Sequence, residues 1–190
     1  MINSVFYAVG HDRPKSYSRG IPVRRGRKHD GGLMLIQGPL YPFLMDGDKE
    51  GRSIFRLRAL GDSISTTSVI SEKRVDAWAR TGIHVLGKPD WIIIKTSMHG
   101  AVDADAALGD QMERIFTYLE SKYNDSSHYV LHYVTARELY NIVKAIEAGE
   151  PSSDPEEYRD FLVRPPIYNS AADCLEASEE LKGLLAKTYR

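Results

Sequence analysis

The sequence predicts an α/β fold built from parallel strand–helix units. Segments typical of strands alternate with segments typical of helices, and most connections between them are only a few residues long. Residues 91–94 form an apolar, β-branched run, the pattern of a strand that is covered on both faces within a parallel sheet. A chain of 190 residues can bury one sizeable core, so we expect one domain or part of one.

The N-terminal third is expected to contribute strands and a long loop. Residues 2–9 indicate a strand that starts almost at the first residue, as in a fragment. Residues 10–32 are basic and broken by glycine and proline, which favours a long loop or an exposed hairpin around residues 21–24. Residues 33–36 predict a second buried strand, and residues 54–57 a weaker one.

Two helices are expected on either side of the residues 91–94 strand. Ser71 has the residue type of an N-cap, and the helix that follows it should end at Gly82. Residues 104–123 predict one longer helix. Its buried stripe is expected to consist of Met112, Ile115, Phe116 and Leu119.

The C-terminal third continues the alternation. Residues 129–134 predict another strand, and Thr135 with Glu138 forms a capping box for a helix that Gly149 closes. Residues 154–157 favour a short helix with proline at its first position. Residues 172–187 predict a moderately amphipathic helix.

Charge excludes some classes of partner. The 25 Lys and Arg residues nearly balance the 26 Asp and Glu residues, so the net charge of −1 predicts no general affinity for nucleic acid or for anionic membranes. Residues 24–28 hold four basic side chains around Gly26. They could grip a polyanion, although most such runs are solvated loops.

Cysteine content and hydropathy suggest the compartment. Cys174 is the single cysteine, which excludes an intramolecular disulfide and a thiolate metal cluster. The sequence shows no apolar run of membrane-spanning length and no basic-then-apolar leader after Met1. We therefore expect a cytoplasmic protein.

The strongest candidate site follows residues 91–94. Lys95, Ser97 and His99 share one side of a strand by the period-two rule, and Gly100 follows where the chain must turn. Ligands of parallel α/β folds bind at the C-terminal ends of strands, which makes His99 a functional candidate. The competing interpretation is a hydrogen-bonded histidine at a solvated strand end.

Other acids and histidines have alternative interpretations. Asp103 and Asp105 could orient His99 or share a metal with it, but they also fit as N-terminal charges on the next helix, which we favour. His128 and His132 have a metal-ligand spacing. On a strand they would lie about 13 Å apart and could not chelate one ion.

Several residues, in this order along the chain, carry a family resemblance. They are Trp78, Gly82, Ile83, His84, Pro89, Trp91, Lys95, His99, Gly100, Ala101, Tyr123, Asn124, Asp125 and the run His132, Tyr133, Val134, Thr135, Ala136, Arg137, Glu138, Tyr140 and Asn141. The pattern resembles the C-terminal half of bacterial polysaccharide-deacetylase-like proteins of the glycoside hydrolase/deacetylase superfamily. It spans roughly residues 2–165.

This resemblance implies part of a distorted seven-stranded (β/α) barrel whose N-terminal strands are missing. Residues 1–165 would form the partial barrel domain and residues 166–190 a helical tail. The resemblance also implies a divalent metal, zinc, and hydrolysis of the amide C–N bond of N-acetyl amino sugars in a polysaccharide. His99 would be the catalytic acid, and Lys95, Ser97 and Arg137 would bind substrate.

The sequence also departs from that family. The family holds its metal with an aspartate and two histidines from N-terminal strands, and no Thr-Phe-Asp-Asp-like segment is present here. No metal-ligating residue is therefore assigned, and a missing N-terminal half is an expected partner. We expect a carbohydrate-deacetylase-like chain that is inactive alone. The alternatives are a non-catalytic α/β domain that binds a sugar or a protein, and a gene fragment that folds poorly by itself.

Overall fold

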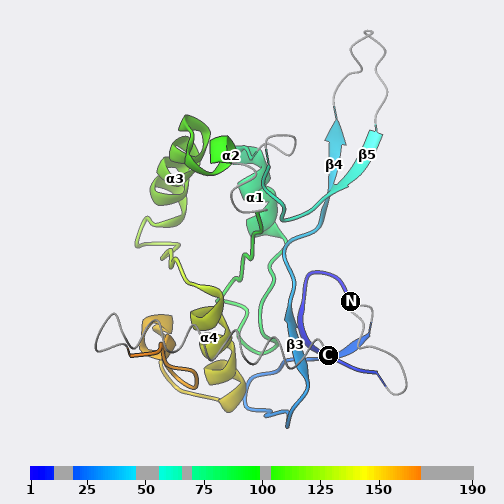
Figure 1. The fold of residues 1–190 in the computed structure, drawn as a ribbon, viewed down its shortest axis with the longest axis vertical. Helices are drawn as coiled ribbons and strands as arrows, with labels where there is room; N and C mark the ends of the chain where they lie inside the picture. The colour runs from blue at the N-terminus through cyan, green and yellow to red at the C-terminus, as the bar shows by residue number, and fades with distance from the viewer. Residues whose placement is uncertain (11–18, 46–55, 66–69, 99–103, 168–190) are drawn as a thin grey trace, which may run out of the picture.

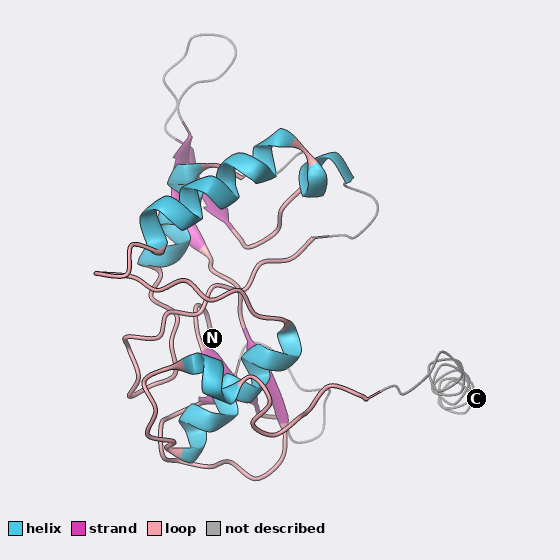
Figure 2. Ribbon diagram, turned by 90° about the vertical axis from the view of Figure 1, so that its left-hand side faces the viewer, coloured by secondary structure: helices cyan, strands magenta, loops and turns pink. Residues whose placement is uncertain are grey.

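A computed structural model describes residues 1–10, 19–45, 56–65, 70–98 and 104–167 (Figure 1). The elements in chain order are β1 (Val5–Ala8), β2 (Gly20–Pro22), β3 (Leu33–Ile36), β4 (Tyr41–Met45), β5 (Arg56–Leu60), α1 (Glu72–Arg80), α2 (Ala104–Leu108), α3 (Asp110–Tyr123), α4 (Ala136–Ala148) and the 3-10 helix η2 (Pro155–Tyr158). Figure 2 shows two groups of elements, with α1, α2, α3 and the β4–β5 hairpin in one and α4 with β1–β3 in the other.

The predicted parallel barrel is wrong, because both sheets are antiparallel. One sheet has three strands in the order β2-β1-β3, and the other consists of β4 and β5. Phe6 of β1 pairs with Pro22 on one side and with Leu35 on the other. Parallel pairing within the described residues is limited to isolated bridges, Arg24 with Leu86 and Ser63 with Ser97.

Two segments that were expected to be strands form no ladder. In residues 91–94, Ile93 is 7% exposed while Ile92 is 41% exposed, so the run is not covered on both faces. At the start of the strand predicted for residues 129–134, the backbone N–H of Tyr129 donates to the Asp125 carboxylate at 2.9 Å, and that of His128, just before it, donates to the same carboxylate at 2.8 Å. These donors are no longer available to a neighbouring strand, so the segment stays a loop.

The local helix signals are confirmed with one correction. Ser71 caps α1, Thr135 and Glu138 form both hydrogen bonds of a capping box on α4, and Gly149 ends α4 in the left-handed region at φ 86°. The single helix expected over residues 104–123 is wrong, because it breaks into α2 and α3 at Gly109. A Cβ at Gly109 would lie 2.5 Å from the Asp105 carbonyl oxygen, so the close approach at this break requires glycine.

The β1–α4 core lies between the three-stranded sheet and helix α4. All four residues of β1 are buried, and Val5 and Tyr7 share a core with the apolar residues of α4. The fully buried members include Val5, Val85 and Val143, each worth about 1.5–3 kcal/mol relative to exposure.

The α1–α3 core is smaller. Val75 and Trp78 of α1 pack with Ile115 of α3, and of the stripe expected on α3 only Ile115 is buried. A polar contact closes the edge of this core, where the Asp76 carboxylate accepts hydrogen bonds from the Tyr118 hydroxyl at 2.7 Å and from the hydroxyl of Tyr123 and the ammonium of Lys122 at 2.8 Å. This carboxylate therefore ties α1 to α3.

No helix in the described part of the chain is long and apolar enough to cross a membrane.

Candidate functional site

Two of the predicted site residues meet at one carboxylate, that of Asp62. The Lys95 ammonium lies 2.5 Å from Asp62 Oδ2, and the Ser97 hydroxyl donates to the same oxygen at 3.2 Å. Lys95 and Ser97 are two residues apart, and both side chains reach the same oxygen. We call these three residues the Asp62 cluster.

Backbone pairing sets the position of the cluster. The Ser97 N–H donates to the Asp62 carbonyl oxygen at 3.2 Å, and the Ile64 N–H donates to the Ser97 carbonyl oxygen at 2.9 Å. These bonds hold the loop after β5 beside the segment that carries Lys95. The cluster is thus built from two segments that are far apart in the sequence and joined by their backbones.

A buried arginine also holds the loop after β5. Arg74 of α1 is 3% exposed, and its guanidinium donates to the carbonyl oxygens of Gly61 and Ser63 at 2.8 and 2.5 Å. Both flanks of Asp62 are therefore fixed by charge-assisted hydrogen bonds. On another side, a Cβ at Gly38 would lie 2.4 Å from the Asp62 side chain, so Gly38 leaves the space that this carboxylate occupies.

The cluster remains open to solvent. The Lys95 side chain is 41% exposed and that of Asp62 is 24% exposed. An ion pair this exposed contributes about 0–1 kcal/mol to the free energy of unfolding, so its contribution to stability is small. The cluster presents a carboxylate that accepts hydrogen bonds, an ammonium that donates them and a hydroxyl that can donate or accept. These groups suit a ligand rich in hydroxyl and amide groups.

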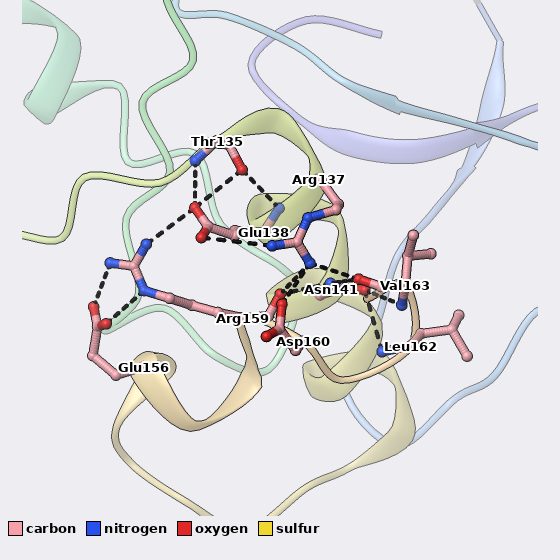
Figure 3. A network of polar contacts seen from close by, with 9 residues as sticks. All are labelled: Thr135, Arg137, Glu138, Asn141, Glu156, Arg159, Asp160, Leu162 and Val163. Atoms are coloured by element: carbon pink, nitrogen blue, oxygen red, sulfur yellow. Dashed lines mark hydrogen bonds and ion pairs between the residues drawn. The ribbon is translucent and has the colours of Figure 1, made fainter. Parts of the chain in front are cut away.

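The other sequence candidates lie elsewhere. Arg137 on α4 donates to the Asp160 carboxylate at 2.6 Å and to the Val163 carbonyl oxygen at 2.6 Å, and these two bonds tie α4 to the segment after η2 (Figure 3). His99 and Asp103 lie outside the described residues, as do Cys174 and the helix predicted for residues 172–187.

The two histidines with a metal-like spacing engage different carboxylates. His128 Nδ1 lies 3.1 Å from Asp125 Oδ2, whereas His132 Nδ1 lies 2.6 Å from Glu156 Oε1. Within the described ranges, no group of three or more histidine, cysteine, aspartate or glutamate side chains converges on one point. The described residues therefore do not fit the divalent metal that the family resemblance implies.

A second surface feature is an apolar groove along α2 and α3. Leu108 is 88% exposed and Phe116 is 47% exposed. The groove has a volume of about 780 Å³ and is lined by Ala107, Leu108, Gly109, Met112, Glu113, Phe116, Thr117, Glu120 and Ser121. Its charged groups are carboxylates alone, so it lacks the paired donor and acceptor charges of the Asp62 cluster.

Sequence reasoning missed Asp62 and Arg74. Asp62 follows Gly61 at the end of a weakly patterned strand, and its partners are 33 and 35 residues away. Arg74 is located in the first turn of an amphipathic helix, where a solvated arginine is the ordinary expectation. The only available signal was Gly38, a glycine beside Pro39 that could mark a close approach as well as the end of a strand.

Comparison of the chain with models of protein families, with curated proteins and with solved structures finds no match.

Proposed function

We propose that the chain binds an N-acetyl amino sugar polysaccharide through the Asp62 cluster and does not deacetylate it alone. The observation that carries the proposal is the meeting of Lys95 and Ser97, both expected from the sequence to bind substrate, at one solvent-accessible carboxylate. The resemblance to polysaccharide-deacetylase-like proteins supports the sugar as the ligand class. Its implied fold does not enter the proposal.

Each member of the cluster has a role that its chemistry permits. The Lys95 ammonium donates to a sugar hydroxyl or to the acetamide carbonyl oxygen, and the Asp62 carboxylate accepts from a hydroxyl or from the acetamide N–H. Ser97 adds a neutral donor and acceptor. Lys95 and Asp62 satisfy each other without ligand, so a bound sugar must replace or share a charge-assisted hydrogen bond of 2.5 Å. This competition predicts weak binding, with a Kd on the order of 1 mM, equivalent to about −4 kcal/mol.

Hydrolysis would require a nucleophilic water and a proton donor. In the proposed role, His99 protonates the leaving amine as general acid. The described residues bring no three metal ligands together, so we expect the chain alone to bind the sugar without releasing acetate. The nucleophile would come from a second polypeptide.

The test is a titration of the isotope-labelled chain with a hexamer of N-acetylglucosamine, followed by amide chemical shifts. We expect saturable shifts at residues 62 and 95–97. Lys95→Met should weaken binding about 10-fold or more, because a hydrogen bond to a charged group contributes roughly 1.5–3 kcal/mol. Lys88→Met is the matched control, because Lys88 also pairs with an aspartate, Asp90, at 2.6 Å.

Two outcomes would refute the proposal. If Phe116→Ala removes binding while Lys95→Met does not, the α2–α3 groove binds the sugar and the Asp62 cluster does not. If the chain alone releases acetate from the hexamer, and His99→Ala stops the release, the chain is a complete enzyme.

A further inference from the structure

A second charged surface lies at the turn that follows β2. Arg24, Arg25, Arg27 and Lys28 are all exposed, and we call residues 24–28 the basic turn. Within the described part of the chain, none of these four side chains forms an ion pair with a carboxylate. The Arg25 guanidinium donates a hydrogen bond to the backbone carbonyl oxygen of Glu150 at 3.5 Å.

The backbone of the basic turn is fixed. The Arg27 N–H donates to the Arg24 carbonyl oxygen at 3.2 Å, which closes a four-residue turn, and Gly26 has φ 69°. A positive φ at the third position alone is the requirement of a type II turn. The Arg25 N–H donates to the Leu86 carbonyl oxygen at 2.8 Å, and the Gly26 N–H donates to Ile146 of α4 at 3.3 Å. The four cations are therefore held on a rigid support.

The pairing inside the turn places two like charges together. Arg24 and Arg27 are antiparallel bridge partners, so their side chains leave the same face of the turn. Directly opposed residues have Cβ atoms about 5 Å apart, and like charges in that position destabilise the pair. A bound anion between the two guanidinium groups would convert this repulsion into two charge-assisted hydrogen bonds.

The groups beside the turn favour a polyanion that has no bases to stack. Asp30 is exposed next to the turn. Asp90 is paired with Lys88, and the bond from Lys88 and the positive charge of Arg25 both lower its pKa. These carboxylates and the net charge of −1 confine the positive potential to the basic turn. The aromatic ring that contacts His29 beside the turn, at a tilt of 58°, belongs to Tyr7, which is 4% exposed, so it offers no stacking surface for bases.

We propose that the basic turn binds an anionic polysaccharide through its sulfate or carboxylate groups, with Arg24 and Arg27 gripping one anionic group between them. Runs rich in arginine and lysine are typical of heparin-like recognition. The site is separate from the Asp62 cluster and does not depend on the function proposed there.

The experiment measures binding of a fluorescent heparin octasaccharide to the whole chain at low and at physiological salt. The double variant Arg24→Gln/Arg27→Gln should bind about 10-fold more weakly than the wild type and show a smaller salt dependence, because fewer ions are released on binding. The control Lys73→Gln/Arg80→Gln removes the same charge from exposed positions of α1 and should change binding less than about 2-fold.

Stability measurements give an independent readout. The octasaccharide should raise the unfolding temperature of the wild type and of Lys95→Met, and should raise that of the Arg24→Gln/Arg27→Gln variant by less at the same ligand concentration. Equal weakening in the α1 control would show a general charge effect and overturn the proposal. Equally tight binding of a duplex DNA of matched charge would overturn the choice of polysaccharide. Absence of heparin binding at low salt would overturn the site itself.

Discussion

Asn141 offers the sharpest test of how the C-terminal part is held together. Its side chain is fully buried on α4 and makes four hydrogen bonds to backbone groups of the segment after η2 (Figure 3). The amide nitrogen donates to the carbonyl oxygens of Arg159 and Val163 at 2.6 and 2.7 Å, and the amide oxygen accepts from the N–H groups of Leu162 and Val163 at 3.2 and 2.8 Å. The Asn141 side chain therefore satisfies two backbone acceptors and two backbone donors in a loop that is not paired in a sheet.

Asn141→Ala should destabilise the chain by about 2–4 kcal/mol. Each neutral hydrogen bond contributes about 1 kcal/mol net, and a buried group that is left unpaired adds a desolvation cost. This loss is a large share of the roughly 5–15 kcal/mol that stabilises a typical domain. With a urea m-value of about 2 kcal/mol/M, the unfolding midpoint should fall by roughly 1–2 M.

Asn141→Asp should add a pH dependence that Asn141→Ala lacks. A carboxylate at this buried position would face the two carbonyl oxygens that now accept from the amide, so its folded-state pKa should rise above the unfolded value of about 3.9. The folded state then binds more protons than the unfolded state. Stability should be highest below the unfolded pKa and fall as the pH rises through the folded pKa.

Asn124→Ala is the matched control. Asn124 is exposed, and its side chain also accepts from a backbone N–H, that of Leu131, at 3.2 Å. Solvent can replace this bond, so we expect a change below about 1 kcal/mol. Equal midpoints for Asn141→Ala and Asn124→Ala would refute the argument, because they would mean that the segment after η2 is not held by α4.

Three further predictions concern caps and charges. Thr135→Ala should cost about 1 kcal/mol in urea unfolding, and Thr135→Ser should recover most of it, because the hydroxyl caps α4. Although burial raises the pKa of Asp76, hydrogen bonds from Lys122 and two tyrosines hold it below its usual value. The stability that this contact contributes should therefore be present above pH about 4 and lost as the pH falls. Urea unfolding of Asp76→Asn should show a flatter decline with falling pH. Bonds from Arg159 and a histidine lower the pKa of Glu156 to about 2, so its NMR titration midpoint should lie near 2 and rise in Arg159→Gln.

The sequence predicted the features that depend on near neighbours. The caps at Ser71 and Thr135 and the left-handed end at Gly149 are formed by groups within four residues of each other, and all three are confirmed. The strand at residues 33–36 is confirmed as a strand, because a short apolar run favours a strand, but its predicted burial is wrong: Leu33 is exposed and the other three residues are half-buried. Local chemistry determines such features, so they can be read without the fold.

The parallel barrel failed because strand partners are not local information. Residues 91–94 form no ladder, because Ile93 donates to Ile83 whereas Ser97 donates to Asp62, so no single neighbour pairs with the whole segment. In the same way, the sequence could not show that Asp125 would accept the N–H groups of residues 127–129. A side-chain acceptor changed the outcome of a segment whose composition favoured a strand.

The candidate site likewise has one part that the sequence predicts and one part that it does not. Period-two spacing predicted that Lys95 and Ser97 share a side, and both contact one oxygen. The identity of their partner could not be predicted, because Asp62 reaches them through the parallel bridge between Ser63 and Ser97. The spacing of residues along a segment therefore predicts which side chains lie together, but it does not predict which residue they contact.

The Asp62 cluster also lies where the two cores are connected. Ile93 is buried in the β1–α4 core, whereas Met98 packs against the α1–α3 core, so Lys95 and Ser97 occupy the stretch between them. Asp62 is held on the other side by Arg74 of α1. A ligand that bridges Lys95 and Asp62 contacts a segment fixed by one core and a loop fixed by the other. Its binding free energy therefore opposes separation of the two cores, by about 2.7 kcal/mol when the ligand is present at 100 times its Kd.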